Sequence, residues 1–355
     1  MVLVADARPE DVPSRRRRAG RLRGAGPRAL GLLAASAVLA ALVLASVAVG
    51  AKPIALGTVF DAFLHYDDAL DDHLIVRGLR VPRTEVGVLV GVALGISGAV
   101  MQGVARNPLA DPGILGVNAG AAFLVVLAIY VLGITSLLGY VWFAFAGAAA
   151  ASVAVYAVGS VGREGATPIK LSLAGAAITA FLGSLTTAVL LVDLSTLDQF
   201  RFWAVGSLAG RTAEIAAQLA PFIIAGSLLA LACGPALNAL ALGDDVARGL
   251  GQRVAHARAA SALAVVVLCG AAVAAAGPIA FVGLVVPHVA RLLCGPDYRW
   301  ILPYSAVLAP ILLLGADVLG RVVVRPGELQ VGIVTAAIGA PFFVWLVRRR
   351  NLAEL

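Results

Sequence analysis

The chain has 355 residues, of which 61% are hydrophobic and 13% charged, with a formal net charge of +7 and a mean hydropathy of +0.96. A soluble globular domain is about 45–50% apolar and about 25% charged. A water-soluble fold of this length would therefore expose apolar surface for which its interior has no room. The composition excludes an ordinary soluble protein and predicts an all-α polytopic membrane protein, because helices satisfy their own backbone groups in lipid.

The first apolar run follows a tail that is rich in arginine. Positive charge beside a span holds that end of the chain in the cytoplasm, so the net charge does not indicate nucleic-acid binding. A secretory or twin-arginine signal is the alternative interpretation, but the run is too long for a signal core and no A-x-A site closes it. We predict an arginine-rich cytoplasmic tail over 1–28 and a single transmembrane domain over 29–350.

Apolar runs of roughly 20 residues are long enough to cross the hydrocarbon core as helices. Short turns that contain glycine or proline separate several of them. With a cytoplasmic N-terminus, most of the 27 lysine and arginine residues fall in inside segments, which favours an even number of spans and two cytoplasmic termini. About ten spans are predicted: 29–50, 82–104, 116–133, 139–161, 170–193, 214–233, 258–276, 279–293, 301–324 and 329–348.

Three stretches between the spans have a character of their own. Residues 51–81 carry five aspartates in an amphipathic pattern, which predicts an outer loop that lies on the membrane surface. Residues 194–213 are too polar to span and too apolar for a plain loop, which predicts a short outer helix. Residues 234–257 form the largest inside loop, with two amphipathic helical patterns.

The sequence gives little support for catalysis by the chain itself. Neither Lys52 nor Lys170 follows a glycine, so no GxxxxGK phosphate loop is present. Any ATP chemistry belongs to another polypeptide. No catalytic or metal-ligating residues are predicted, since the cysteines and histidines lack the spacing of a metal site. An intramembrane enzyme would need paired catalytic groups, and the sequence shows none.

Two carboxylates within the spans keep an ion-coupled secondary carrier open as an alternative. Such carriers place ionisable groups near the membrane centre. Glu85 lies within one turn of a span end, and Asp317 stands four residues before Arg321, a spacing that predicts an ion pair on one helix.

Basic residues on the outer side run against the positive-inside tendency. Arg80 and Arg83 flank the start of one span, and Arg321 and Arg325 end another. Two interpretations stay open from the residues alone: ordinary anchoring at the interface, or docking of acidic side chains from an extracytoplasmic binding protein.

The inside loop 234–257 combines charged residues with apolar ones. A loop that meets only solvent does not need an apolar stripe, so the pattern favours a surface for a partner protein. The apolar positions are Leu240, Leu242, Val246 and Leu250.

Residues 80–121, RVPRTEVGVLVGVALGISGAVMQGVARNPLADPGILGVNAGA, resemble the FecCD-type permeases of type II ABC importers, which carry ferric siderophores, haem or cobalamin. The resemblance covers nearly the whole chain after Pro53. It continues through LSLAGAAITAFLGS (171–184), LALGDDVARGLG (240–251), GPIAFVGLVVPHVARLL (277–293), LLGADVLGR (313–321) and ELQVGIVTAAIGAPFFVWL (328–346).

The resemblance implies site residues in three places. Paired coupling helices that dock on the ATPases correspond to 240–251, and a gate at the inner end of the pathway corresponds to 167–169. The span from Leu171, the loop before it, the helix near 196–210 and the last span resemble elements that line the pathway. The implied residues are Leu242, Gly243, Asp244, Asp245, Leu250 and Gly251 for ATPase coupling, Arg80, Arg83 and Arg321 for binding-protein docking, and Thr167, Pro168 and Ile169 for the gate.

The family also implies an assembly. We expect two permease subunits, identical or paralogous, two ABC ATPases and an extracytoplasmic binding protein, in the cytoplasmic (inner) membrane of a bacterium. The chain is expected to bind no cofactor, with ATP and Mg²⁺ held by the partner ATPase. A ferric siderophore is the favoured cargo, haem or cobalamin is the alternative, and the cobalamin member has small hydroxyl residues where Pro168 and Ile169 stand.

Overall fold

The computed structural model describes residues 22, 24–50, 52–134, 136–162, 167–325 and 327–349, and within these ranges every regular element is helical. Most of the predicted tail therefore lies outside the described residues. Ten helices occupy the positions of the ten predicted spans. They are α1 (Ala25–Ala48), α4 (Val81–Ala105), α5 (Val117–Leu132), α6 (Leu137–Gly159), α7 (Pro168–Val192), α9 (Ala213–Ala232), α12 (Val254–Ala276), α13 (Val282–Cys294), α14 (Tyr298–Val323) and α15 (Val331–Arg349).

Shorter elements connect these helices. The predicted outer loop holds α2 (Leu56–Leu64), α3 (Asp71–Leu74) and a π-helix, η1 (Ile75–Arg80), which continues directly into α4. The predicted short outer helix is α8 (Leu194–Ala204). The predicted inside loop holds α10 (Gly234–Leu240) and α11 (Asp244–Gly249), and a 3₁₀ turn, η2 (Pro112–Leu115), precedes α5.

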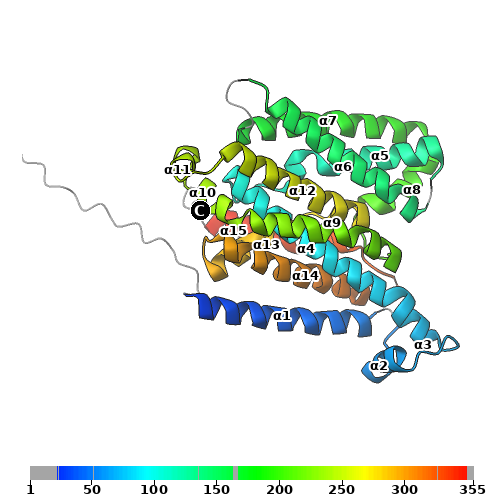
Figure 1. Ribbon diagram of the computed structural model, residues 1–355. Coiled ribbons are helices and arrows are strands. Elements are labelled where there is room, and N and C mark those ends of the chain that lie inside the picture. The colour runs from blue at the N-terminus through cyan, green and yellow to red at the C-terminus, as the bar shows by residue number, and fades with distance from the viewer. Residues whose placement is uncertain are drawn as a thin grey trace, which may run out of the picture.

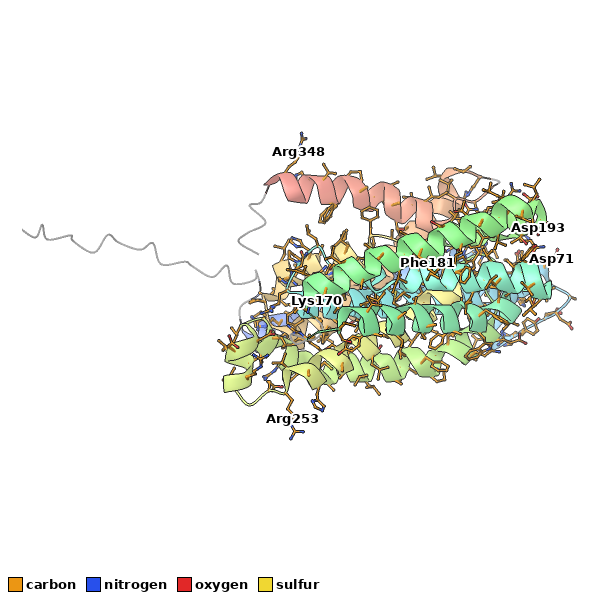
Figure 2. The ribbon with its side chains drawn as sticks, turned by 90° about the horizontal axis from the view of Figure 1, so that it is seen from above. Asp71, Lys170, Phe181, Asp193, Arg253 and Arg348 are labelled. Atoms are coloured by element: carbon orange, nitrogen blue, oxygen red, sulfur yellow. The ribbon has the colours of Figure 1, made fainter. Side chains whose placement is uncertain are left out.

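The connecting elements gather at the two ends of the bundle. Figure 1 shows α10 and α11 at the same end as the start of α1 and the end of α15, whereas α2, α3 and α8 lie at the opposite end. Figure 2 places Lys170, Arg253 and Arg348 at the first end and Asp71 and Asp193 at the second. We call these the α11 end and the α8 end.

Helix α4 lies at the centre of the bundle. It packs against α14, α12, α9 and α13, and most of its side chains are buried. Small residues allow these close approaches. At Gly98 a Cβ atom would overlap the carbonyl oxygen of Gly283, so the backbones of α4 and α13 touch where a larger residue has no room.

Helices α5 and α13, with 16 and 13 residues, are shorter than a full span. Seven described helices are long and apolar enough to cross a membrane, while α5, α13 and α15 are shorter apolar helices. Before α5, the turn η2 packs against α6, α7 and α12, with Pro112 and Leu115 buried. Irregular backbone is tolerated at membrane depth where protein covers it, so α5 begins inside the bundle.

Candidate functional sites

The α11 end presents an exposed apolar surface. Gly243 takes a φ of +103°, a conformation that favours glycine, and this turn separates α10 from α11. Leu242, Val246 and Leu250 are 52%, 50% and 62% exposed, whereas Leu240 is buried in the core. The predicted apolar stripe is therefore correct at three positions and wrong at Leu240, which packs inward. We call Leu242, Val246 and Leu250 the α11 surface.

Asp244 fixes α11 to two spanning helices. Its Oδ1 accepts a hydrogen bond from Nη2 of Arg258 on α12 at 3.0 Å and lies 3.2 Å from Nη2 of Arg106 at the end of α4. Asp245, by contrast, is exposed, and within the described part of the chain it pairs only with Arg248 on the same short helix. The family resemblance implies one role for both aspartates, but their contacts differ: Asp244 holds α11 to α4 and α12, and Asp245 is a surface charge.

The predicted gate residues lie at the start of α7, at the α11 end. Thr167 caps the helix, since its Oγ1 accepts from the backbone N–H of Lys170 at 3.4 Å, and Pro168 is the first helical residue. Ile169 is 74% exposed. The preceding loop, 163–166, lies outside the described residues.

Helix α7 leaves a long face uncovered by the rest of the chain. The exposed positions continue from the start of the helix to its end and include small, hydroxyl and apolar residues, with Phe181 near the middle (Figure 2). A helix that is apolar and exposed on this scale faces lipid, a second subunit or a pathway. The exposed small and hydroxyl residues are Ser172, Ala176, Ala177, Thr179, Ala180, Gly183, Ser184, Thr187 and Ala188.

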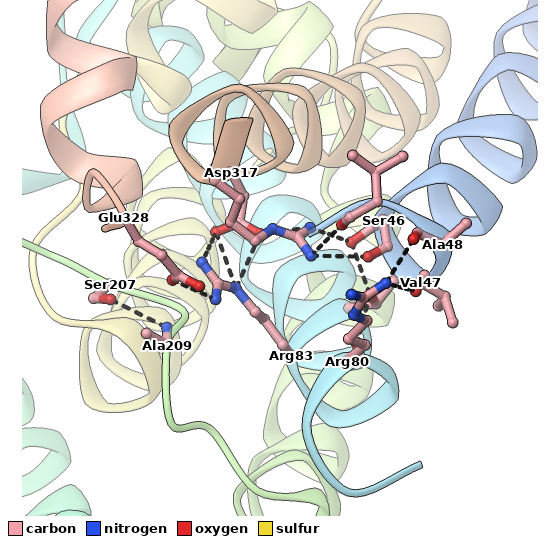
Figure 3. A network of polar contacts seen from close by, with 12 residues as sticks. Ser46, Val47, Ala48, Arg80, Arg83, Ser207, Ala209, Asp317 and Glu328 are labelled. Atoms are coloured by element: carbon pink, nitrogen blue, oxygen red, sulfur yellow. Dashed lines mark hydrogen bonds and ion pairs between the residues drawn. The ribbon is translucent and has the colours of Figure 1, made fainter. Parts of the chain in front are cut away.

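At the α8 end, Asp317 joins two arginines in a buried cluster (Figure 3). Its carboxylate lies 2.8 Å from Nη2 of Arg83 on α4 and 3.0 Å from Nη2 of Arg321 on its own helix. Nη1 of Arg83 also donates to Glu328 at 2.7 Å. The ion pair that the spacing of Asp317 and Arg321 predicted is confirmed, and it belongs to a larger network that binds α4 to α14.

Arg321 and Arg80 hold the end of α1. Arg321 donates through Nη1 to the carbonyl oxygens of Ser46 and Val49, both at 2.9 Å. Arg80 donates to the carbonyls of Val47 and Ala48 and of Lys52. Except for that of Lys52, these carbonyls lie at the end of α1, where the last carbonyl oxygens of a helix have no N–H donor within the helix.

The three predicted docking arginines thus have different surroundings. Arg80 and Arg321 are 6% and 2% exposed, and their guanidinium groups donate to acceptors within the chain. The side chain of Arg83 is 11% exposed and bonds the partly exposed Glu328. Arg83 is the most exposed of the three residues, and its bond to Glu328 is open to the surface.

The sequence that forms this polytopic bundle matches a known family. The FecCD transport family model covers residues 38–349. The chain belongs to the FecCD transport family.

Curated FecCD-type relatives cover most of the chain. It is 45% identical to the probable siderophore transport system permease protein YfiZ of Bacillus subtilis, over 88% of this chain and 93% of the relative. It is 48% identical to the ferric enterobactin permease FepD of Escherichia coli, over 86% and 91%. A solved metal-chelate type ABC transporter in an inward-facing conformation has 27% identity and a TM-score of 0.78, over 91% of this chain and 100% of the other. The chain is therefore an ABC importer permease of the metal-chelate type.

The two carboxylates of the carrier alternative lie in different environments in this FecCD permease. Asp317 is fully buried between two guanidinium groups, whereas Glu85 is exposed on α4. Nothing brings them together as a relay among the described residues, so the ion-coupled alternative gains no support.

Arg211 is a further buried arginine at the α8 end, in the connection between α8 and α9. It is 8% exposed, and burial, the main cause, lowers its pKa to about 10. Sequence reasoning gave no role to Arg211 or Glu328. Arg211 could have been noticed from the sequence, because it is a charged residue in a connection of small and uncharged residues. Nothing in the sequence links Glu328 to Arg83.

Proposed function

We propose that this FecCD permease forms the translocation pathway for a ferric siderophore that an extracytoplasmic binding protein delivers. The observation that carries the choice of cargo is the high identity to named siderophore permeases. Identity is 45–48% to YfiZ and FepD, and 39% to a hemin permease of Yersinia pestis and a cobalamin permease of Halobacterium salinarum. Two further iron permeases of Bacillus subtilis have identities of 36% and 39%.

The exposed face of α7 supports a pathway that holds its cargo weakly. Small and hydroxyl side chains on this helix offer few strong contacts, which suits a bulky chelate that has to leave again. Affinity would then belong to the binding protein. We propose that α7, α8 and α15 line the pathway together with a second permease subunit, with Thr167, Pro168 and Ile169 at its inner gate.

The α11 surface is proposed as the docking site for an ABC ATPase. Three exposed apolar side chains, Leu242, Val246 and Leu250, project from a short helical unit that Asp244 ties to α4 and α12. A rigidly held apolar patch with charged neighbours is typical of an interface core. ATP-driven movement of the ATPases would then reach the spans through α11, with ATP and Mg²⁺ on the ATPases.

At the α8 end we propose that an acidic binding protein docks around Arg83. Arg80 and Arg321 would contribute positive charge to steering while they hold the end of α1 in place. This arrangement requires the α11 end, and so both ends of the described chain, to face the cytoplasm of a bacterium whose inner membrane holds the protein.

The decisive experiment is ATP hydrolysis by the reconstituted importer. The chain is purified with its co-expressed ATPase and binding protein and placed in lipid vesicles, and ferric siderophores, haem and cobalamin are added in parallel. We expect a ferric siderophore to stimulate hydrolysis several-fold and the other two to do little. Stimulation by haem or cobalamin alone would reassign the cargo, and uphill uptake by the chain without an ATPase would refute the importer function.

A further inference from the structure

A groove with a volume of about 630 Å³ opens near the α8 end, between α1, α2, α4 and α9. Its walls are almost entirely apolar, with Val43, Leu44 and Val47 from α1 and a row of alanines from α9. The volume is within the range of about 300–1,000 Å³ that is typical of ligand pockets. Three of its walls are spanning helices, so the groove opens at the depth of the membrane.

Helix α2 marks the depth at which the groove opens. It buries Val59 and Ala62 against the protein and exposes Phe60 and Phe63, which also line the groove, at 55% and 47%. Short amphipathic helices of this kind lie in the plane of the membrane interface. The part of the groove beside α2 is therefore at the level of the lipid headgroups. The part between α1 and α9 is beside the acyl chains.

A carboxylate lines this apolar groove. Glu85 on α4 is exposed, and among the described residues it forms no hydrogen bond or ion pair, whereas the adjacent Thr84 is buried and bonded to Ser46 at 2.8 Å. A charge beside hydrocarbon is costly unless a cation neutralises it. The chain provides no cation for Glu85 within the described part of the structure, so the partner comes from outside the chain.

A guanidinium group contacts one of the residues that line the groove. Arg77 stacks over Tyr66 at 4.7 Å and lies 5.9 Å from the ring of Phe63, a groove residue. The site thus combines an apolar channel, a carboxylate and a guanidinium group. Arginine matches phosphate, and a carboxylate accepts hydrogen bonds from a primary ammonium group.

We propose that the groove binds a phospholipid with a primary ammonium headgroup, of the phosphatidylethanolamine type. One acyl chain lies along α1 and α9, the ammonium group donates to Glu85, and the phosphate faces Arg77. Phosphatidylglycerol has no cation for Glu85. Phosphatidylcholine has a cation without an N–H donor, so it loses the charge-assisted hydrogen bond.

The test is native mass spectrometry of the purified full-length chain with phosphatidylethanolamine, phosphatidylcholine and phosphatidylglycerol of identical acyl chains. The wild-type protein should retain phosphatidylethanolamine best. Glu85→Gln should lower this retention about tenfold, the value of one charge-assisted hydrogen bond, and Glu85→Asp should keep the preference. Glu214→Gln removes an exposed carboxylate on α9 that does not line the groove, and should change nothing.

A second variant tests the acyl-chain part separately from the charge. Ala217→Leu narrows the groove and leaves Glu85 in place, so it should weaken retention of all three lipids. Equal retention of ethanolamine and choline lipids by the wild type, or an unchanged preference in Glu85→Gln, would overturn the proposal. A dimeric chain that retains no lipid would also overturn it, because a second copy would then cover the groove.

Discussion

Nη2 of Arg83 on α4 and Oδ1 of Asp317 on α14 lie 2.8 Å apart in the interior of the α8 end. Asp317 is fully buried, and it also neutralises Arg321. Buried ion pairs add little stability compared with apolar packing, but loss of one partner leaves an uncompensated charge. Asp317 is therefore a counter-charge for two buried guanidinium groups.

Substitution Asp317→Asn should destabilise the protein strongly. Arg321 would lose its counter-charge and Arg83 would keep only the partly exposed Glu328, for which a loss of about 3–5 kcal/mol is expected. The measurement is thermal unfolding of the purified chain in detergent, followed by tryptophan fluorescence. The matched control is Asp198→Asn, since Asp198 forms an exposed pair with Arg201 and such pairs contribute about 0–1 kcal/mol. Equal shifts in the two variants would contradict the role of Asp317.

The two aspartates of α11 should differ in their effect on ATPase binding. Asp244→Asn removes the contacts to Arg106 and Arg258, so α11 loses its fixed position and the affinity for the ATPase should fall about tenfold. Asp245→Asn removes only an exposed pair and should leave the affinity nearly unchanged. Binding of the co-purified ATPase to each variant in nanodiscs measures the difference in affinity. A larger effect at Asp245 would refute the role of Asp244 as the residue that holds α11 in place.

An acidic residue in the α11 surface should abolish most ATPase association. Leu250→Asp places a charge in the centre of the proposed interface, where a truncation alone costs about 1–2 kcal/mol. We expect at least a tenfold loss of affinity with normal membrane insertion. Leu64→Asp is the control, because Leu64 is exposed at the α8 end. If both variants bind the ATPase alike, the α11 surface is not the docking site.

The first turn of α8 should lose stability in acid. Hydrogen bonds from the side chains of Thr196 and Ser195, in that order, lower the pKa of Asp193. A lowered folded pKa means that the capping contribution is present above the unfolded pKa of about 3.9 and is lost as the pH falls through the folded value. Amide hydrogen exchange, as protection factors of α8 at several pH values, should show this loss.

Asp193→Ala should abolish this pH dependence and reduce protection of α8 at neutral pH, because the helix loses its cap. Asp198→Ala, in the middle of the same helix, should do neither. Unchanged protection in Asp193→Ala would show that packing alone maintains α8.

Two glycine-to-alanine substitutions should change the free energy of unfolding in opposite directions. Gly98→Ala places a methyl group against the carbonyl of Gly283, and overpacking of this kind costs about 1–3 kcal/mol. At Gly315, in the interior of α14, an added Cβ meets nothing within 4 Å, so alanine should stabilise the helix by up to about 1 kcal/mol. Thermal unfolding of both variants measures the contrast, and destabilisation by both would mean that α14 needs its glycine for another reason.

Hydropathy predicted the bundle because each span has to be apolar over a set length. The predicted ends of the spans are wrong where backbone conformation, and not hydropathy, decides where a helix begins. The span predicted at 279–293 begins instead at Val282, since Gly277 and Phe281 take positive φ values and interrupt the helix between α12 and α13. The span predicted from 258 begins at Val254, because polar residues extend α12 beyond its apolar part.

The candidate sites were only partly predictable. The pair of Asp317 and Arg321 followed from helical spacing. Arg83 is 234 residues from Asp317 in sequence, so only the packing of α4 on α14 brings them together. The burial of Arg80 and Arg321 could not be predicted either, because their acceptors are backbone carbonyls at the end of α1, and every residue has such a group.

The contact between Asp244 and Arg106 has a mechanical consequence. Arg106 follows the last residue of α4 and adopts a left-handed backbone conformation, and the buried turn η2 lies a few residues farther along the chain. If a partner protein docks on α11 as proposed, a displacement of α11 would reach the central helix α4 through the Asp244 carboxylate, and α12 through the same carboxylate and Arg258. One small anionic group would then decide how far movement at the surface continues into the membrane.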